Sequence, residues 1–138
     1  MKRYLFDTNV ISELRKPKPH GGVVAWMRNL QYEQVFLSAI TIGELQAGVE
    51  LTRKQDPPKA KEIEDWIDVM VQQVQVLTMD VLCFREWARL MTGKPHQIVA
   101  DAMMAATARV HGLTVATRNE SDFKYFDVPL FNPFTYPK

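Results

Sequence analysis

Short apolar runs alternate along this chain with longer segments in which apolar residues recur at helical spacing. The runs predict strands at residues 4–6, 35–37, 74–77 and 113–116, and the proline-interrupted segment 128–134 predicts a further strand at the sheet edge. Strands this short, separated by helices, favour parallel pairing through right-handed crossovers. The pattern therefore predicts an α/β fold, a three-layer α/β/α sandwich with a short, mainly parallel sheet.

Six segments carry the helical pattern, and residues that start or stop helices separate them. The expected helices cover residues 10–15, a short segment opened by Gly21 and Gly22, 41–54, 59–71, the segment from Asp80 to Met91, and 98–111. Asp56-Pro57-Pro58 is expected to end the third helix before the fourth begins. Asp80 is expected to cap the fifth helix, and Gly112 is expected to end the last one.

Composition and charge narrow the class of protein. The 138 residues suffice for one domain, which we expect to span residues 1–138. No apolar run approaches the roughly 20 residues of a bilayer span, so we expect a cytoplasmic protein without membrane contact. Seventeen basic and sixteen acidic residues leave a net charge of +1, which gives no support for a large phosphate-binding patch. The single cysteine, Cys83, excludes an intrachain disulfide and a CxxC metal site.

The acid that fits its surroundings least well is Asp101. It interrupts an apolar helical stretch, and Ile98, Ala102 and Ala105 share its face of the helix. A carboxylate on a close-packed face needs a partner or a metal ion. The structural alternative is that Asp101 compensates the helix dipole from the first turn.

Three further acids are candidates for the same site. Asp7 directly follows the first strand, where it either caps the next helix or projects from the strand end into a cleft. Glu44 lies near the start of its helix, on the side that we expect to be buried. Asp122 follows the fourth strand, and the loop between them offers the further oxygens of Thr117 and Asn119.

The predicted topology brings these four acids to one edge of the sheet. Sites in parallel sheets collect at the carboxyl ends of the strands, and the helix that carries Asp101 can join that edge. Converging carboxylates repel one another, so their ionisation is favourable only with a cation between them. Oxygen ligands point to Mg²⁺ or Mn²⁺ rather than zinc. His20, His96 and His111 lack metal-ligand spacing and are expected in a linker, on a loop surface and at a helix end.

Four segments resemble, in the same order, the motifs of PIN-domain ribonucleases. They are Leu5–Leu14 (LFDTNVISEL), Leu37–Leu45 (LSAITIGEL), Asp101–Ala108 (DAMMAATA) and Leu113–Phe123 (LTVATRNESDF). The ending Leu130–Phe134 is similar to that of toxins of the VapC and FitB type. Each motif alone is a weak signal, but four in order over nearly the whole chain are a strong one.

The resemblance implies a PIN-like fold and the toxin of a type II toxin–antitoxin pair. Such a toxin is a Mg²⁺- or Mn²⁺-dependent endoribonuclease that acts on RNA and that a cognate antitoxin inhibits. The resemblance also implies a homodimer and hetero-oligomers with the antitoxin, and contact with operator DNA only through the antitoxin.

The resemblance also assigns roles by position. Asp7, Glu44 and Asp101 match the three core metal-binding acids, and Thr117 matches a hydroxyl that supports the site. Asn9 is expected to support it as well.

The fourth metal-binding position departs from the family pattern. Many members have an acid directly after Thr-Arg, where this chain has Asn119. Either Asp122, three residues later, supplies the charge, or Asn119 binds through its amide. Arg118, beside the site, either contacts phosphate or is an exposed arginine at a strand end.

We expect the carboxylates to hold one or two metal ions and so to promote attack of water on a phosphodiester. In-line hydrolysis of this kind leaves a 5′-phosphate and a 3′-hydroxyl. Two alternatives stay open: a metal-dependent DNA nuclease or phosphatase that uses the same acids, and a non-catalytic antitoxin-binding co-repressor in which the acids only cap helices.

Overall fold

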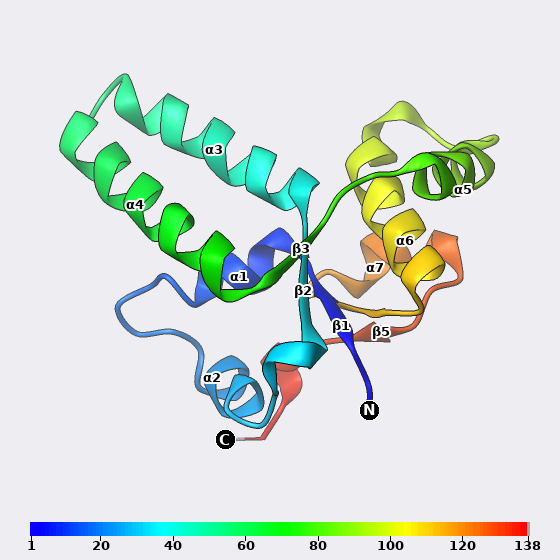
Figure 1. Ribbon diagram of the computed structural model, residues 1–138, viewed down its shortest axis with the longest axis horizontal. Coiled ribbons are helices and arrows are strands. Elements are labelled where there is room, and N and C mark those ends of the chain that lie inside the picture. Colours follow the sequence, from blue (N-terminus) through cyan, green and yellow to red (C-terminus); the bar gives the residue numbers. More distant parts are fainter. Residues whose placement is uncertain (138) are drawn as a thin grey trace.

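A parallel sheet of five strands lies at the centre of the molecule (Figure 1). The strand order is β3-β2-β1-β4-β5, and every neighbouring pair is parallel, which confirms the predicted α/β class. The strands are β1 (Tyr4–Phe6), β2 (Val35–Ser38), β3 (Gln75–Leu77), β4 (Thr114–Ala116) and β5 (Leu130–Phe131). Edge strand β5 is shorter than expected because Pro129 and Pro133 flank it. This computed structural model describes residues 1–137, so Lys138 of the predicted domain lies outside the described residues.

Helices cover both faces of the sheet and complete the three predicted layers. In Figure 1, α1 to α4 lie on one side of the sheet and α5 to α7 on the other. The helices are α1 (Thr8–Glu13), α2 (Gly21–Met27), α3 (Ala39–Arg53), α4 (Pro57–Gln73), α5 (Val81–Met91), α6 (Val99–His111) and α7 (Glu120–Phe123). Among the residues that the structure describes, none of the helices is both long and apolar enough to cross a membrane.

Asp56-Pro57-Pro58 separates α3 from α4, as predicted, but the proline pair also forms the first turn of α4. Asp56 Oδ1 accepts a hydrogen bond from the backbone N–H of Lys59 at 3.1 Å and so caps α4. Pro57 and Pro58 occupy the first turn, where a backbone N–H has no helical partner and its loss costs little. Helix α4 therefore begins two residues earlier than expected.

Other helix ends are set by residues that the sequence marks clearly. Asp80 caps α5 through the backbone N–H of Cys83 at 2.9 Å, and Gly112 ends α6 with a φ of 66°, as predicted. His20 lies in the linker between α1 and α2, as expected, and it also has a structural role there. Its Nδ1 accepts a hydrogen bond from the N–H of Gly22 at 3.0 Å, so His20 caps α2.

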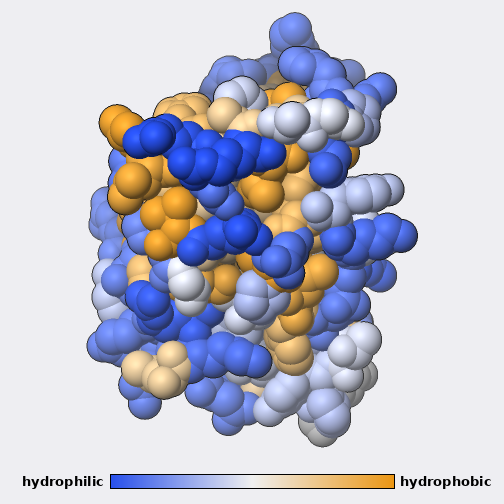
Figure 2. All heavy atoms as spheres, turned by 90° about the vertical axis from the view of Figure 1, so that its right-hand side faces the viewer, coloured by the Kyte–Doolittle hydropathy of each residue, from blue (hydrophilic) through white to orange (hydrophobic). Residues whose placement is uncertain are grey.

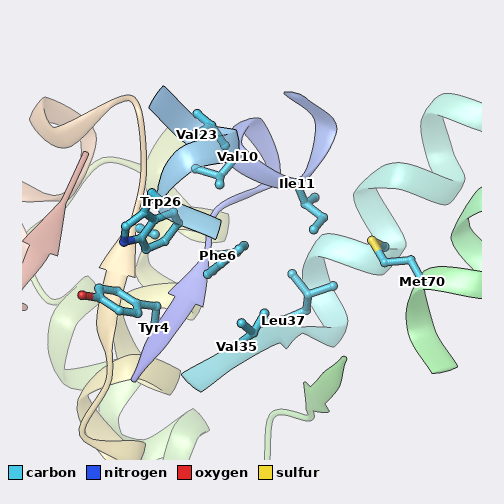
Figure 3. Close-up of a cluster of buried hydrophobic side chains, with 10 residues drawn as sticks. Tyr4, Phe6, Val10, Ile11, Val23, Trp26, Val35, Leu37 and Met70 are labelled. Atoms are coloured by element: carbon cyan, nitrogen blue, oxygen red, sulfur yellow. The ribbon is translucent and has the colours of Figure 1, made fainter. Parts of the chain in front are cut away.

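Apolar clusters on both faces of the sheet hold the layers together. On one face, Trp26 of α2 lies against Tyr4 and Phe6 of β1, with ring centroids 5.0 and 5.2 Å apart (Figure 3). The same indole reaches Phe131 of β5 at 5.2 Å. On the other face, buried alanines of α6 pack against Leu5. Trp26 thus connects α2 to both β1 and the sheet edge.

Truncating Trp26 is therefore expected to destabilise the fold. The Trp26 side chain is 4% exposed, and replacing a buried tryptophan by alanine costs about 3–5 kcal/mol. We expect that loss in the free energy of unfolding of Trp26→Ala, measured by urea denaturation and circular dichroism. Tyr32→Ala is the control, since Tyr32 is 56% exposed and surface truncations change the free energy of unfolding by less than about 0.5 kcal/mol. Equal losses in the two variants would contradict this account.

Candidate active site

Asp7 lies at the carboxyl end of β1 and is fixed by hydrogen bonds. Its backbone N–H donates to the carbonyl of Ala116 at 2.9 Å, which extends the β1–β4 pairing. Its Oδ1 accepts from the N–H of Thr8 at 2.8 Å, so Asp7 caps α1, which begins at Thr8 and not at residue 10 as expected. Its Oδ2 accepts from the Thr117 hydroxyl at 2.8 Å and from the Asn9 amide at 3.1 Å. Asp7 thus combines a capping role with a fixed position at the sheet edge.

Thr117 and Asn9 join the loop after β4 to the start of α1. Thr117 is fully buried, and its hydroxyl oxygen also accepts from the backbone N–H of Asn119 at 3.0 Å. Asn9 Oδ1 accepts from the backbone N–H of Arg118 at 3.2 Å. The two side chains therefore hold this loop against Asp7, which is where supporting residues are expected.

Glu44 lies on α3 and faces Thr8. Its Oε1 accepts a hydrogen bond from the Thr8 hydroxyl at 2.8 Å, and the hydroxyl oxygens of Thr8 and Thr41 lie 3.3 Å apart. Glu44 is exposed, so the expectation that its side of α3 is buried is wrong. The physical reason is that α4 packs along another side of α3, around Val49, and leaves Glu44 and Gly48 open to solvent.

Asp101 lies half-buried in the first turn of α6. Burial is the largest cause that raises its pKa, and together with the negative charges of Asp7, Asp122 and Glu44 it brings the pKa to about 6. A helix N-terminus on its own lowers the pKa of a carboxyl. The direction of the pKa shift therefore argues against dipole compensation as the reason for an acid at this position, and it shows that the four acids are electrostatically coupled.

Asp122 lies exposed in the first turn of α7, and its charge acts on two of the other acids. The pKa of Asp7 is raised, first by burial and further by the charge of Asp122, although hydrogen bonds to the Asp7 carboxylate oppose the rise. Asp122 also contributes to the raised pKa of Asp101. Asn119 carries no charge, and its backbone N–H is bound to Thr117. Of the two residues expected to complete the set, Asp122 is the one coupled to the other acids.

The four acids form an open group without a compensating cation. None of them belongs to an ion pair within residues 1–137. The described part of the chain also holds no group of three Asp, Glu, His or Cys side chains close enough to grip one ion. The acids therefore interact through charge and not through contact. Uncompensated charge on oxygen donors fits a hard divalent cation such as Mg²⁺ or Mn²⁺.

Two arginines border the acidic group. The Arg118 guanidinium lies 4.6 Å from the centre of the Phe134 ring, a cation–π contact. Arg15 lines a hollow of about 320 Å³ whose wall also includes Thr8 and Glu44. Within residues 1–137, neither arginine forms an ion pair. The charge of Arg118 contributes to the lowered pKa of Glu13, so Arg118 acts on that acid as well as on any anionic ligand that approaches.

Sequence reasoning missed two residues near the site. Thr8 positions Glu44, and its one signal is that it directly follows Asp7. Glu13 is 7% exposed, accepts from the N–H of His20 at 2.9 Å and pairs with Lys16 at 2.9 Å. The hydrogen bond from Lys16 lowers the pKa of Glu13. Glu13 thus anchors the connection from α1 to α2, a role that no local pattern distinguishes from that of a solvated acid.

Known proteins share both the sequence and the fold. The model of the PIN domain family matches residues 4–128. Toxin FitB of Neisseria gonorrhoeae is 38% identical over 137 residues, which cover 94% of this chain and 97% of FitB. VapC ribonuclease Y4jK of Sinorhizobium fredii is 36% identical over 140 residues, which cover 94% of this chain and 96% of the relative. In the solved structure of FitAB bound to an IR36 DNA fragment, a chain 34% identical aligns with a TM-score of 0.83 over 98% of both chains.

The family match spans most of the residues, the relatives have nearly the same length, and the fold agrees with a solved relative. This chain belongs to the PIN domain family.

Proposed function

We propose that this chain is the toxin of a type II toxin–antitoxin pair and a Mg²⁺- or Mn²⁺-dependent endoribonuclease. The observation that carries the proposal is the pKa of Asp101, raised to about 6 by burial and by the charges of Asp7, Asp122 and Glu44. Coupled carboxylates without a cationic partner favour a divalent cation. The printed names of the relatives, Toxin FitB and VapC ribonuclease Y4jK, support the toxic and RNA-cleaving parts of the proposal.

Four carboxylates supply the negative charge for the cation: Asp7, Glu44, Asp101 and Asp122. Because no three of them lie close enough to grip one ion among residues 1–137, binding would draw them together. Thr117 and Thr8 orient two of them through hydrogen bonds of 2.8 Å each. When bound, a divalent cation neutralises phosphate charge and makes water a better nucleophile. The hydrogen-bonded acids fix the geometry before substrate arrives, and the half-buried carboxylate on α6 supplies the charge that most needs a counter-ion.

We propose that Arg118 and Arg15 bind the RNA backbone on either side of the acids. The Arg118 backbone is tied to Asn9, and its guanidinium is held over Phe134, so both of its ends are positioned. Arg15 stands in the wall of the hollow beside Glu44. Contacts of this kind fix the position of a nucleic-acid strand without reading its sequence. A strand that follows the two arginines would bring a phosphodiester to the acids.

We propose a cognate antitoxin as the protein partner, with operator DNA reached only through that antitoxin. The structure of FitAB bound to a DNA fragment supports an assembly of this kind that contacts DNA. Because the proposed substrate is cellular RNA, we place the protein in the cytoplasm.

A non-catalytic co-repressor is the less supported alternative, since it requires the acids to act only as helix caps. Of the four, Asp7 alone caps a helix. Ser38 caps α3, so Glu44 is not needed there, and Asp101 lies inside α6 with a raised pKa. A DNA nuclease or a phosphatase would use the same acids. The substrate that the protein cleaves distinguishes these two activities from the proposed one.

Asp101→Asn is expected to abolish RNA cleavage while the fold is kept. The substitution removes one cation-binding charge, and we expect the Mg²⁺-dependent cleavage rate of a single-stranded RNA to fall at least about 100-fold. Asp68→Asn, the same change at an exposed position of α4, should cleave like wild type. Cleavage of a matched DNA strand in preference to RNA, or full activity in excess EDTA, would refute the metal-dependent ribonuclease proposal.

The same substitution is expected to stabilise the metal-free protein at pH 7. The pKa of Asp101 is about 6 in the folded protein, against an ordinary value of 3.8. The folded state therefore binds more protons than the unfolded state between these values, and the free energy of unfolding falls as the pH rises from about 4 to about 6. Asp101→Asn removes this loss. Because solvent screens the half-buried carboxylate, we expect a gain of about 1 kcal/mol.

Urea unfolding in EDTA at pH 7 and at pH 4 measures this effect. The gain from Asp101→Asn should be present at pH 7 and nearly absent at pH 4, where the carboxyl is protonated in the folded state. Asp68→Asn should show neither effect. A loss of stability at pH 7, or an equal gain at both pH values, would show that Asp101 is not repelled by its neighbours.

A further inference from the structure

A small pocket lies where the start of α6 meets the end of α7. It has a volume of about 170 Å³ and is lined by Lys94, Pro95, Ile98 and Tyr125. One wall comes from the loop that enters α6 through the short 3₁₀ helix η2 (His96–Ile98), and the other comes from the 3₁₀ helix η3 (Lys124–Phe126), into which α7 continues. The pocket therefore belongs to the two helices that carry Asp101 and Asp122.

Each wall of the pocket stands one helical turn from an acid of the site. Ile98 precedes Asp101 by three positions at the start of α6, and Tyr125 follows Asp122 by three positions. Residues three apart in a helix have their Cβ atoms about 5–6 Å apart. A chain-like ligand whose reacting group lies at the acids would therefore place its neighbouring unit at this pocket.

Tyr125 presents an aromatic ring to solvent from a fixed position. Its side chain is 58% exposed, and its ring meets the buried ring of Phe126 at an angle of 70°, with the centroids 6.4 Å apart. Arg109 Nη1 donates to the carbonyls of Phe126 and Asp127 at 3.2 and 2.6 Å, which holds the chain directly after Tyr125. An exposed ring that is held in this way is a platform on which any nucleobase can stack.

The size of the pocket suits a single ring. A cavity of roughly 150 Å³ accommodates one benzene molecule, and this pocket measures about 170 Å³, with the apolar side chains of Pro95 and Ile98 beside Tyr125. Figure 2 views the molecule from the side of α5 and α6 and shows apolar areas between bands of polar side chains. The space fits one unpaired base and is too small for a base pair.

Two lysines give the pocket a positive border. Lys94 lines it, and Nζ of Lys124 lies 5.9 Å from the centre of the Tyr125 ring. The backbone N–H of Lys94 donates to the carbonyl of Met91 at 2.9 Å, which fixes the backbone of this lysine. Neither lysine forms an ion pair within residues 1–137. An apolar side chain of a protein partner needs no cations beside it, whereas a nucleotide brings phosphate to them.

We propose that this pocket, the Tyr125 subsite, holds one unpaired base of the RNA stacked on Tyr125, while Lys94 and Lys124 bind the adjacent phosphates. The inference rests on the proposed function, since it assigns the place of a nucleotide that neighbours the cleaved bond. A base in a duplex is not free to leave its stack and enter the pocket. The subsite therefore directs cleavage to single-stranded segments of RNA.

Two matched ligands separate the contact with the base from the contact with the backbone. One is a fluorescein-labelled oligouridylate, and the other is a labelled ribose-phosphate chain of the same length without bases. Fluorescence anisotropy measures both dissociation constants with the full-length Asp101→Asn protein in EDTA, so that binding depends neither on a metal ion nor on cleavage. Tyr125→Ala should raise the dissociation constant for oligouridylate about tenfold or more and leave that for the abasic chain unchanged. Tyr125→Phe, which keeps the ring, should bind both ligands like the parent protein.

Replacing a lysine of the subsite should have a different signature. Lys94→Gln removes a phosphate contact, so it should weaken both ligands alike and reduce the slope of log Kd against log salt by about 0.7. Two controls remove the same side chains from other surfaces: Tyr32→Ala, at a position that is 56% exposed, and Lys54→Gln, at the exposed end of α3. Both should bind like the parent protein, and circular dichroism checks that every variant is folded.

The remaining outcomes count against the subsite. A parent protein that binds oligouridylate no more tightly than the abasic chain overturns it, and so does a Tyr125→Ala protein that keeps its affinity for oligouridylate. Equal losses for the two ligands in Tyr125→Ala would show that Tyr125 does not contact a base. If the wild-type protein cleaves RNA in spite of such a result, the proposed function stands and the subsite falls. Base-dependent binding by a wild-type protein that cleaves no RNA would have the opposite meaning.

Discussion

Thr117 donates a hydrogen bond of 2.8 Å to Asp7, and the two residues are 110 positions apart in the chain. The contact depends on the parallel pairing of β1 with β4, which places Phe6 beside Ala116 and continues through the Asp7 backbone. Because both strands run the same way, both deliver their next residue to the same edge. The register of two three-residue strands thus fixes the position of the acid on which the other site residues converge.

The ionised carboxylates of the site destabilise the folded protein. Burial raises the pKa of Asp7 and of Asp101, and each is raised further by neighbouring charge, so the ionised site costs free energy in the absence of a cation. Apolar layers on both faces of the sheet offset that cost, with Phe6, Leu37 and Val115 fully buried between them. A site that lowers stability inside a well-packed fold is typical of residues retained for binding or catalysis.

Much of the fold follows from sequence, because short apolar runs and helical periodicity are local patterns. Strands at 4–6 and 114–116 lie within one residue of their predicted bounds. Asp101 stands out in the sequence because it interrupts an apolar helical stretch. The features of the structure that the sequence does not predict depend on how helices and strands pack against one another. Helical periodicity predicts that Glu44 is buried, but α4 packs on another side of α3 and leaves Glu44 exposed. The roles of Glu13 and His20 depend on the connection between α1 and α2. The same limit applies to Leu82 of α5, an apolar residue in a helical pattern that nevertheless faces solvent.

The central claim is that repulsion among four carboxylates creates a binding site for a divalent cation. The most direct test is calorimetric titration of Mn²⁺ and Mg²⁺ into the metal-free protein at pH 7, beside Asp101→Asn and Asp68→Asn. The account predicts binding to wild type and to Asp68→Asn, with little proton release at pH 7, since the pKa of Asp101 is about 6. It also predicts loss of that binding in Asp101→Asn. Equal binding to all three proteins, or no binding to wild type, would contradict it.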